Sequence, residues 1–256
     1  GNLTGDGVYT YGYDQLGQMV SSGTDSYAYD ALGKRILKSV GMDSLIYSYL
    51  GEQLLATYDD DLLNYYDEIY LEGQLLARIV DDGSATDVSY AHLNHLGSPV
   101  AFTDKTGAVV WPEQSGGTPC EIHHYEPFGA DFNDIGTPIF SPQDARYTGK
   151  LFDTSTGKHY FNARYYNGIT DDASYEMPSR FLSPDILKGN PDDPQGWNRY
   201  GYCRNNPFSL IDPSGLRDVK LQFYYNLSEG QMTAEAKQET ERIYTNAFER
   251  FGNTKE

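Results

Sequence analysis

Residues 26–38 read SYAYDALGKRILK, and this stretch decides how the chain folds. Its two ends are short alternating segments, and the four residues between them run from Asp30 to Gly33. An aspartate that opens a tight turn bonds its own downstream backbone, while a glycine at the end tolerates a positive φ angle. The stretch therefore predicts a β-hairpin, two short strands joined by a tight turn.

The same hairpin pattern recurs along most of the chain. A first copy stands at 13–17, and the segment YLGEQLLA at 49–56 nearly recurs as YLEGQLLA at 70–77. Shorter echoes follow at 95–100, 102–107, 125–129 and 151–157. One hairpin cannot bury its own apolar face, so the copies are expected to stack into an extended sheet. The predicted fold is mainly β, a hairpin array followed by a short α/β tail.

The composition excludes several classes of protein. The 256 residues suffice for one large domain or two ordinary ones, and 23 tyrosines with 11 phenylalanines exclude a disordered chain. Acidic residues outnumber basic ones by 37 to 19, and the net charge of −18 argues against nucleic-acid binding. No apolar stretch has the length of a membrane span, and the N-terminus lacks the regions of a signal peptide. Cys120 and Cys203 are too few for a disulfide scaffold; they could pair once, but two free or buried thiols are the preferred interpretation.

The sequence changes character twice after the repeats. Residues 167–216 hold half of the 12 prolines, each of which fixes a φ angle, so this segment is expected to be irregular but ordered. Beyond Arg217, alternation along 219–225 predicts a strand, and an apolar stripe along 234–251 predicts a helix capped by Thr233. A domain boundary is therefore predicted near residue 216, with too few residues after it for most independent folds.

Five phrases between residues 146 and 216 carry a family resemblance. They are RYTGK (146–150), YFNARYY (160–166), RFLSPD (180–185), NRYGYCRNNP (198–207) and DPSGL (212–216). In this order they resemble the C-terminal core of the Rhs/YD-repeat family, which includes Rhs polymorphic toxins and the C subunits of insecticidal toxin complexes. The spacing from Pro207 through Asp212, Pro213 and Gly215 to Leu216 matches the family's terminal motif. The upstream repeats extend the resemblance over roughly residues 8–216.

The resemblance implies a fold and an activity. The family's β-sheet shell winds into a hollow cocoon around a C-terminal toxin, and it cuts the chain after the last leucine of the terminal motif, here the Leu216–Arg217 bond. The family's cleavage residues correspond to Asp185, Asp212 and Arg164. The chain departs from the family pattern at 167–179, which replaces a short turn. The assignment of Arg164 thus depends on whether this longer segment leaves the site intact.

Elementary chemistry supports the same reading. Two neighbouring carboxylates cannot both ionise cheaply, so one is kept protonated while the other serves as a base. Such a pair can activate water or polarise a carbonyl, and an arginine would stabilise the charge. Gly215 would allow a close backbone approach beside the scissile bond. The alternative is that Asp185 and Asp212 only cap turns beside proline.

The resemblance also implies an organisation and partners. Residues 1–145 would form the repeat shell, 146–216 the core with the cleavage motif, and 217–256 the start of a variable effector. The expected partners are the chain's own C-terminal segment and upstream shell repeats, with an immunity protein and a secretion-system component as further candidates. No cofactor and no metal is expected, and the protein would be secreted or delivered. The rival hypotheses are a non-enzymatic surface module that binds carbohydrate or protein, and a tail that is an independent enzyme fragment.

Other residues invite weaker hypotheses. The histidines at 92, 95, 123 and 124 could suggest zinc, but their spacing is poor and no Cys-x-x-Cys pair supports them. The acidic run 59–61 could suggest calcium, but it lacks the ligand spacing, and a solvated hairpin turn is preferred. The tyrosines could line a sugar-binding surface, but cross-strand ladders are the preferred interpretation.

Overall fold

The structure is a computed structural model that describes residues 1–111, 113–114, 118–119, 123–130, 145–168, 179–187 and 194–221. The residues described up to Leu221 belong to one compact unit, Gly1–Leu221. The predicted helix at 234–251, most of the strand predicted at 219–225, and Cys120 lie outside the described residues. The α part of the predicted tail therefore stays a prediction.

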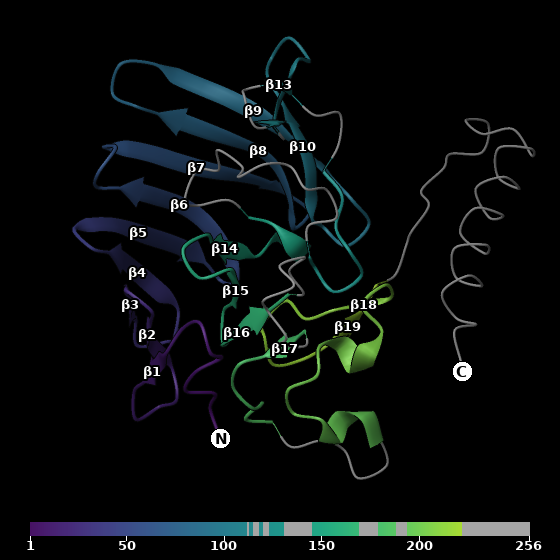
Figure 1. Ribbon diagram of the computed structural model, residues 1–256. Helices are drawn as coiled ribbons and strands as arrows, with labels where there is room; N and C mark the ends of the chain where they lie inside the picture. Colours follow the sequence, from purple (N-terminus) through teal and green to yellow (C-terminus); the bar gives the residue numbers. More distant parts are fainter. Residues whose placement is uncertain are drawn as a thin grey trace, which may run out of the picture. The chain divides into compact units, whose positions relative to one another are not determined.

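An eleven-stranded antiparallel sheet forms most of the described unit (Figure 1), and its strands follow one another in chain order. They are β1 (Tyr11–Tyr13), β2 (Met19–Ser22), β3 (Asp25–Tyr29), β4 (Arg35–Val40), β5 (Asp43–Leu50), β6 (Gln53–Asp59), β7 (Asn64–Leu71), β8 (Gln74–Asp81), β9 (Thr86–Leu93), β10 (Pro99–Thr103) and β11 (Val109–Trp111). Each inner strand of this long sheet pairs with the strand before it and the strand after it in the sequence, as in a series of hairpins. The predicted hairpin array is confirmed.

The tight turns form as their sequence predicts. The Oδ1 atom of Asp30 accepts hydrogen bonds from the amides of Leu32 (2.9 Å) and Lys34 (2.8 Å). Gly33, at φ +84°, donates its amide to the carbonyl of Asp30 over 3.1 Å. The turns that begin at residues 14, 94 and 104 repeat this bonding pattern. The repeated phrase is thus one local device that reverses the chain.

Three smaller sheets and three short 3₁₀ helices complete the described part. A four-stranded antiparallel sheet consists of β14 (Leu151–Asp153), β15 (Lys158–Phe161), β16 (Arg164–Asn167) and β17 (Arg180–Phe181). Two pairs of short strands are β12 (Glu113–Gln114) with β13 (Thr118–Pro119), and β18 (Leu210–Ile211) with β19 (Val219–Lys220). The 3₁₀ helices are η1 (Tyr147–Gly149), η2 (Pro194–Trp197) and η3 (Cys203–Asn205). The described part holds no α-helix, and none of its helices is long and apolar enough to cross a membrane.

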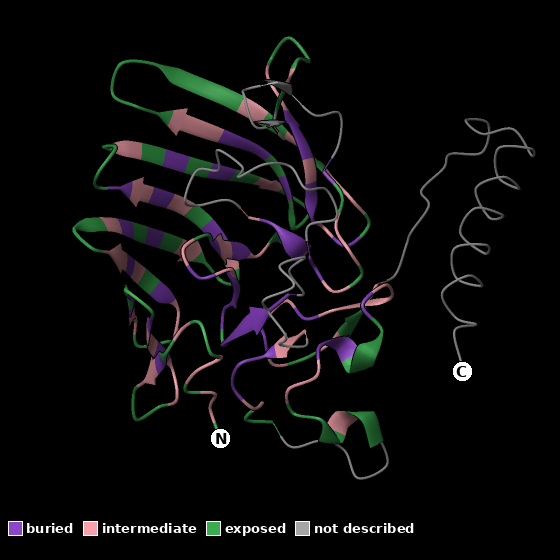
Figure 2. Ribbon diagram, viewed as in Figure 1, coloured by how far each residue is buried: buried purple, intermediate pink, exposed green. Residues whose placement is uncertain are grey.

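The core lies between the long sheet and the four-stranded sheet. Strand β7 alternates between buried and exposed positions, whereas every residue of β15 and β16 is buried (Figure 2). One cluster of buried hydrophobic side chains contains residues of both sheets, and in it the ring centroids of Tyr27 and Tyr165 lie 5.2 Å apart. Tyr58 and Tyr65 pair across β6 and β7 at 4.7 Å. Tyrosines therefore hold strands and sheets together, as the ladder interpretation predicts.

Buried charges also join the two sheets. Arg35 on β4 is fully buried and donates to Asp153 of β14 over 2.7 Å. Lys38, three residues further along β4, has its Nζ atom 3.3 Å from Asp153 and 3.2 Å from Asp25. Burial alone raises the pKa of Asp153, but the charges of Arg35 and Lys38 outweigh it and hold that pKa below its ordinary value. The second sheet, which carries the candidate site, is thus fixed on the first.

Candidate functional site

The hairpin of β15 and β16 holds the segment 212–216 by its backbone. The amide of Ala163 donates to the carbonyl of Ser214 over 3.1 Å, and Arg164 Nε donates to the carbonyl of Gly215. Asn162, at the tip of the hairpin, donates its side-chain amide to the carbonyl of Pro213 over 3.0 Å. Three successive carbonyls are therefore bound to three successive residues of the hairpin. The segment 212–216 is called the cleavage loop below, because cleavage is predicted at its C-terminal end.

Gly215 is required by this arrangement. Its φ is +74°, and a Cβ atom on it would lie 2.1 Å from the carbonyl oxygen of Phe161. A backbone atom cannot swing aside as a side chain does, so any other residue would push the loop off the hairpin. The close backbone approach predicted at Gly215 is present.

Arg164 brings the two predicted aspartates together. Its Nη2 atom lies 3.1 Å from Asp185 Oδ2 and 3.4 Å from Asp212 Oδ2. The guanidinium also lies over the ring of Phe181, 3.6 Å from the centroid, and is nearly inaccessible to solvent. Of the segment 167–179, where the chain departs from the family pattern, 169–178 lie outside the described residues.

Asp212 lies against the predicted scissile bond. Its Oδ1 atom accepts the amide of Leu216 over 3.1 Å and the amide of Arg217 over 3.0 Å. Burial raises the pKa of this carboxyl above its ordinary value, and the Arg217 amide and the charge of Arg164 oppose that rise. A carboxyl with a raised pKa is suited to carry a proton.

Asp185, the second carboxyl that contacts Arg164, is more exposed to solvent than Asp212. Its side chain is 16% exposed, against 5% for Asp212. Its Oδ1 atom accepts the amide of Leu187 over 2.8 Å, and its backbone carbonyl accepts the guanidinium of Arg199. The two carboxyls thus differ in solvation while they share one cation.

A pocket of about 330 Å³ opens onto these groups. Both aspartates, Arg164 and the Leu216 and Arg217 residues of the scissile bond line it. The pocket has room for water beside the bond, because a single water needs far less volume. Of the two other motif residues, Pro213 lies in the loop, and Pro207 is buried between η3 and β18.

Sequence reasoning missed several residues that build this site. Phe181 packs on Arg164, Arg199 binds the backbone of Asp185, and Asn162 binds the loop. All three residues lie inside the sequence phrases that carried the family resemblance, so those phrases could have identified them as part of the site. Cys203 is a free, buried thiol that lines the same pocket.

The other candidates have structural places. His123 is buried and packs edge-on against Tyr125 at 4.5 Å, and His92 bonds the Thr103 hydroxyl over 2.9 Å. Among the residues that the structure describes, no three metal-binding side chains cluster. The acidic run does form a turn, but Asp59 is buried there and not solvated. Its Oδ1 atom accepts two turn amides, which draws the side chain inward.

Comparisons with known proteins relate the chain to bacterial toxins. No protein-family model matches it. It is 31% identical over 225 residues to the tRNA(Glu)-specific nuclease WapA of Bacillus subtilis subsp. natto, covering 84% of this chain and 9% of that protein. It is 28% identical to the double-stranded DNA deaminase toxin A of Burkholderia cenocepacia (62% of this chain, 10% of that protein). It is also 28% identical to toxin protein Tse5 of Pseudomonas aeruginosa (61% and 10%). The chain thus spans about a tenth of the length of these relatives.

Solved structures show the same fold. The TcdB2–TccC3–Cdc42 crystal structure aligns over 81% of this chain and 10% of that chain, with a TM-score of 0.55 and 22% identity. A Tc holotoxin pore from Photorhabdus luminescens aligns over 86% and 10%, with a TM-score of 0.56 and 20% identity. The chain is therefore a β protein that is similar in sequence to parts of bacterial toxins and whose fold also occurs in Tc toxin structures.

Proposed function

We propose that the chain is the C-terminal part of a toxin shell that cuts itself once, at the Leu216–Arg217 bond. The observation that carries the proposal is the shared cation: one nitrogen of Arg164 contacts both Asp185 and Asp212. Asp212 also accepts the Leu216 amide and the Arg217 amide, whose nitrogen belongs to the scissile bond. A turn-capping aspartate needs neither a buried arginine nor a second carboxylate. The capping alternative therefore leaves the centre of the site unexplained.

The two carboxyls have different tasks in the proposed reaction. Asp185, the more exposed carboxyl, takes a proton from a water molecule while the oxygen of that water attacks the carbonyl carbon of Leu216. Asp212 carries a proton in this scheme, a form that burial favours. It gives the proton to the Arg217 nitrogen once the carbonyl carbon of Leu216 has become tetrahedral; in the resting site the amide of Arg217 donates to Asp212 Oδ1 over 3.0 Å. The carbon–nitrogen bond breaks, and the products are a carboxyl on Leu216 and an amine on Arg217. The proton and the negative charge have then exchanged places between the two aspartates.

Arg164 suits this exchange because it contacts both carboxyls. The pair carries one negative charge before and after the reaction, and the guanidinium stabilises it on either side. Asp212 lies four residues before the bond that it would help to cut, so loop folding alone delivers the substrate. The reaction is a single turnover and uses no cofactor.

The long sheet supports the shell part of the proposal. It is a repeat array of hairpins, and solved Tc toxin structures share its fold. We infer that such arrays enclose the segment that follows Leu216 and that cleavage separates this segment from the shell. Since the relatives' names describe activities on tRNA and on double-stranded DNA, a nucleic-acid-directed effector after residue 216 is one candidate for the cargo. Upstream repeats, an immunity protein and a secretion-system component are the proposed partners, and the protein would be secreted or delivered.

Intact-mass spectrometry tests the cleavage. The parent chain is expected to yield a fragment that ends at Leu216, and Asp185→Asn and Asp212→Asn variants are expected to stay whole. Asp87→Asn, which alters an exposed carboxylate on β9, is the matched control and should cleave like the parent. If the parent stays whole, a longer polypeptide with further upstream repeats is measured. A whole chain there too refutes self-cleavage and favours the non-enzymatic module that binds carbohydrate or protein.

A further inference from the structure

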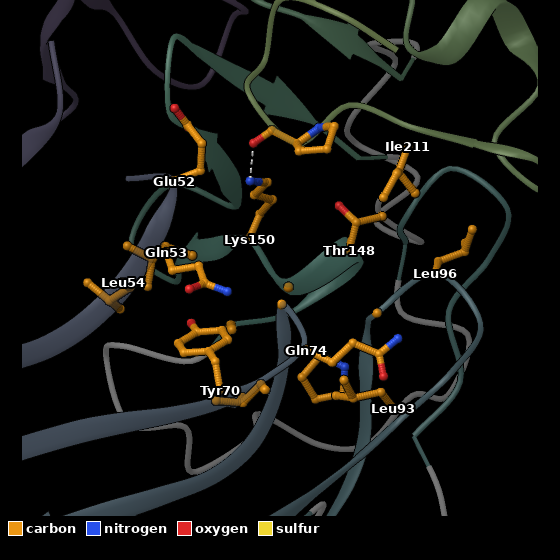
Figure 3. Close-up of a pocket in the computed structure, with 18 of the residues that line it drawn as sticks. Glu52, Gln53, Leu54, Tyr70, Gln74, Leu93, Leu96, Thr148, Lys150 and Ile211 are labelled. Carbon is orange, nitrogen blue, oxygen red and sulfur yellow. Dashed lines mark hydrogen bonds between the residues drawn. The ribbon is translucent and has the colours of Figure 1, made fainter. Parts of the chain in front are cut away.

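A second pocket lies behind the cleavage loop. It has a volume of about 310 Å³, and Figure 3 shows Glu52 and Gln53, Tyr70, Gln74 and the side chain of Lys150 around it. Asp212 lines this pocket as well as the one that opens onto the scissile bond. The loop is therefore the wall between two pockets, and whatever holds its rear side also holds Asp212.

Lys150 is the charged group at that rear side. Its Nζ atom donates a hydrogen bond to the carbonyl oxygen of Pro213, the residue that follows Asp212 (Figure 3). The side-chain amide of Asn162 donates to the same oxygen over 3.0 Å and to Glu52 Oε2 over 2.6 Å. Two donors thus fix one peptide group immediately beside the carboxyl that the proposed reaction needs.

The ammonium of Lys150 lies in an environment that is unusual for a lysine, a residue type found mostly at protein surfaces. Its bonded partner is a neutral carbonyl, and no described carboxylate lies within ion-pair distance of it. Glu52, whose charge acts on Lys150, forms its ion pair with Lys34. The ring of Phe161 lies 5.7 Å from the Nζ atom. Burial lowers the pKa of Lys150 to about 8, although the charges of Glu52 and Asp212 oppose this. Burying an amine in this way costs stability, and a purely structural contact could be made more cheaply by a neutral side chain.

We propose that Lys150 is a positioning residue for self-cleavage, whose ammonium holds the Pro213 carbonyl and thereby keeps Asp212 against the Leu216–Arg217 bond. The inference rests on the proposed function and names a residue outside the Arg164, Asp185 and Asp212 set. Cleavage is sensitive to such a contact, because a displacement of about 1 Å at a reacting group can cost a hundredfold in rate.

The proposal predicts an alkaline limb in the rate of cleavage. Above about pH 8, Lys150 loses its charge, and the charge-assisted bond to Pro213 becomes an ordinary one. The charges that act on Lys150 are those of Glu52, Asp212 and Lys34. The other titratable side chains that line the pocket are Glu68, His95, Tyr49, Tyr70 and Tyr160. Asp212 is the proton donor of the proposed reaction and titrates too, so only a limb that the Lys150 variants lack is assigned to Lys150.

The test is the rate of fragment formation after dilution from urea, measured from about pH 6 to about pH 10. Lys150→Met should slow cleavage about tenfold or more at neutral pH and remove the alkaline limb. Lys150→Arg keeps its charge throughout this range, so it should cleave without an alkaline limb. Lys105→Met, at an exposed turn position, is the matched control and should behave like the parent.

The outcomes separate this inference from the proposed function. If the parent cleaves and Lys150→Met cleaves within twofold of it with the same pH profile, the positioning role is refuted. Should Lys150→Met fail to fold by circular dichroism, Lys150→Arg decides: retention of the parent's alkaline limb refutes the role. If neither the parent nor the longer polypeptide with further upstream repeats cleaves, the proposed function itself is refuted.

Discussion

The buried pair of Arg35 and Asp153 gives the most quantitative prediction about stability. Both side chains are essentially inaccessible to solvent, and their atoms lie 2.7 Å apart. Changing Asp153→Asn leaves Arg35 charged and buried without its counter-ion, and such a break typically costs about 3–5 kcal/mol. The rings of Tyr47 and Tyr160, 4.9 and 4.6 Å from the guanidinium carbon, remain and offset part of the loss. We therefore expect a loss near the lower bound, about 3 kcal/mol.

Urea unfolding followed by circular dichroism measures this loss. Asp87→Asn removes an exposed carboxylate and should change the free energy of unfolding by no more than about 0.5 kcal/mol. A loss below about 1 kcal/mol for Asp153→Asn would refute the reasoning, because it would mean that the site is not desolvated as the structure has it.

The same pair predicts a dependence on pH. The folded pKa of Asp153 is lowered, so the unfolded state binds the proton more readily. Its stabilising contribution is therefore fully present above the ordinary value of 3.8 and is lost as the pH falls through the lower folded value. Unfolding curves between about pH 2 and pH 6 should show a smaller acid-induced loss in Asp153→Asn than in the parent. An equal loss in both proteins would contradict the assignment.

Three further changes test single contacts. Gly215→Ala should abolish cleavage in the mass assay while far-ultraviolet circular dichroism stays unchanged, since the new methyl would meet the Phe161 carbonyl; normal cleavage would show that the loop does not need this approach. Asp30→Ala removes the acceptor of two turn amides and should lower the free energy of unfolding by about 1 kcal/mol, and an unchanged urea midpoint would argue against the turn's role. Tyr165→Phe removes the hydroxyl that lies 3.0 Å from Arg35 Nη1 and should cost about 1–3 kcal/mol; a neutral result would mean that water replaces it.

The local elements could be predicted from sequence because their chemistry is local. A turn such as that from Asp30 to Gly33 needs only its own carboxylate, its own amides and one glycine that tolerates a positive φ. Repetition of this device determines a meander of antiparallel hairpins, and the long sheet has this order. The resemblance added Arg164, Asp185 and Asp212, and the structure brings the three together, while their catalytic role stays a proposal.

Only the tertiary structure decided which face of each strand is buried and what lies behind the loop. In β4, Arg35 is fully buried and Ile36 is 38% exposed, the reverse of what residue polarity favours. Charges can be buried there because Asp153 arrives from a strand more than a hundred residues away, which no local pattern encodes. Nothing in the sequence around Lys150 distinguishes it from a surface lysine. Its contact with the Pro213 carbonyl, 63 residues away in the sequence, forms only in the folded chain. The sequence by itself thus determined the hairpins, whose contacts are short-range, and the fold decided the site's support, whose contacts are long-range.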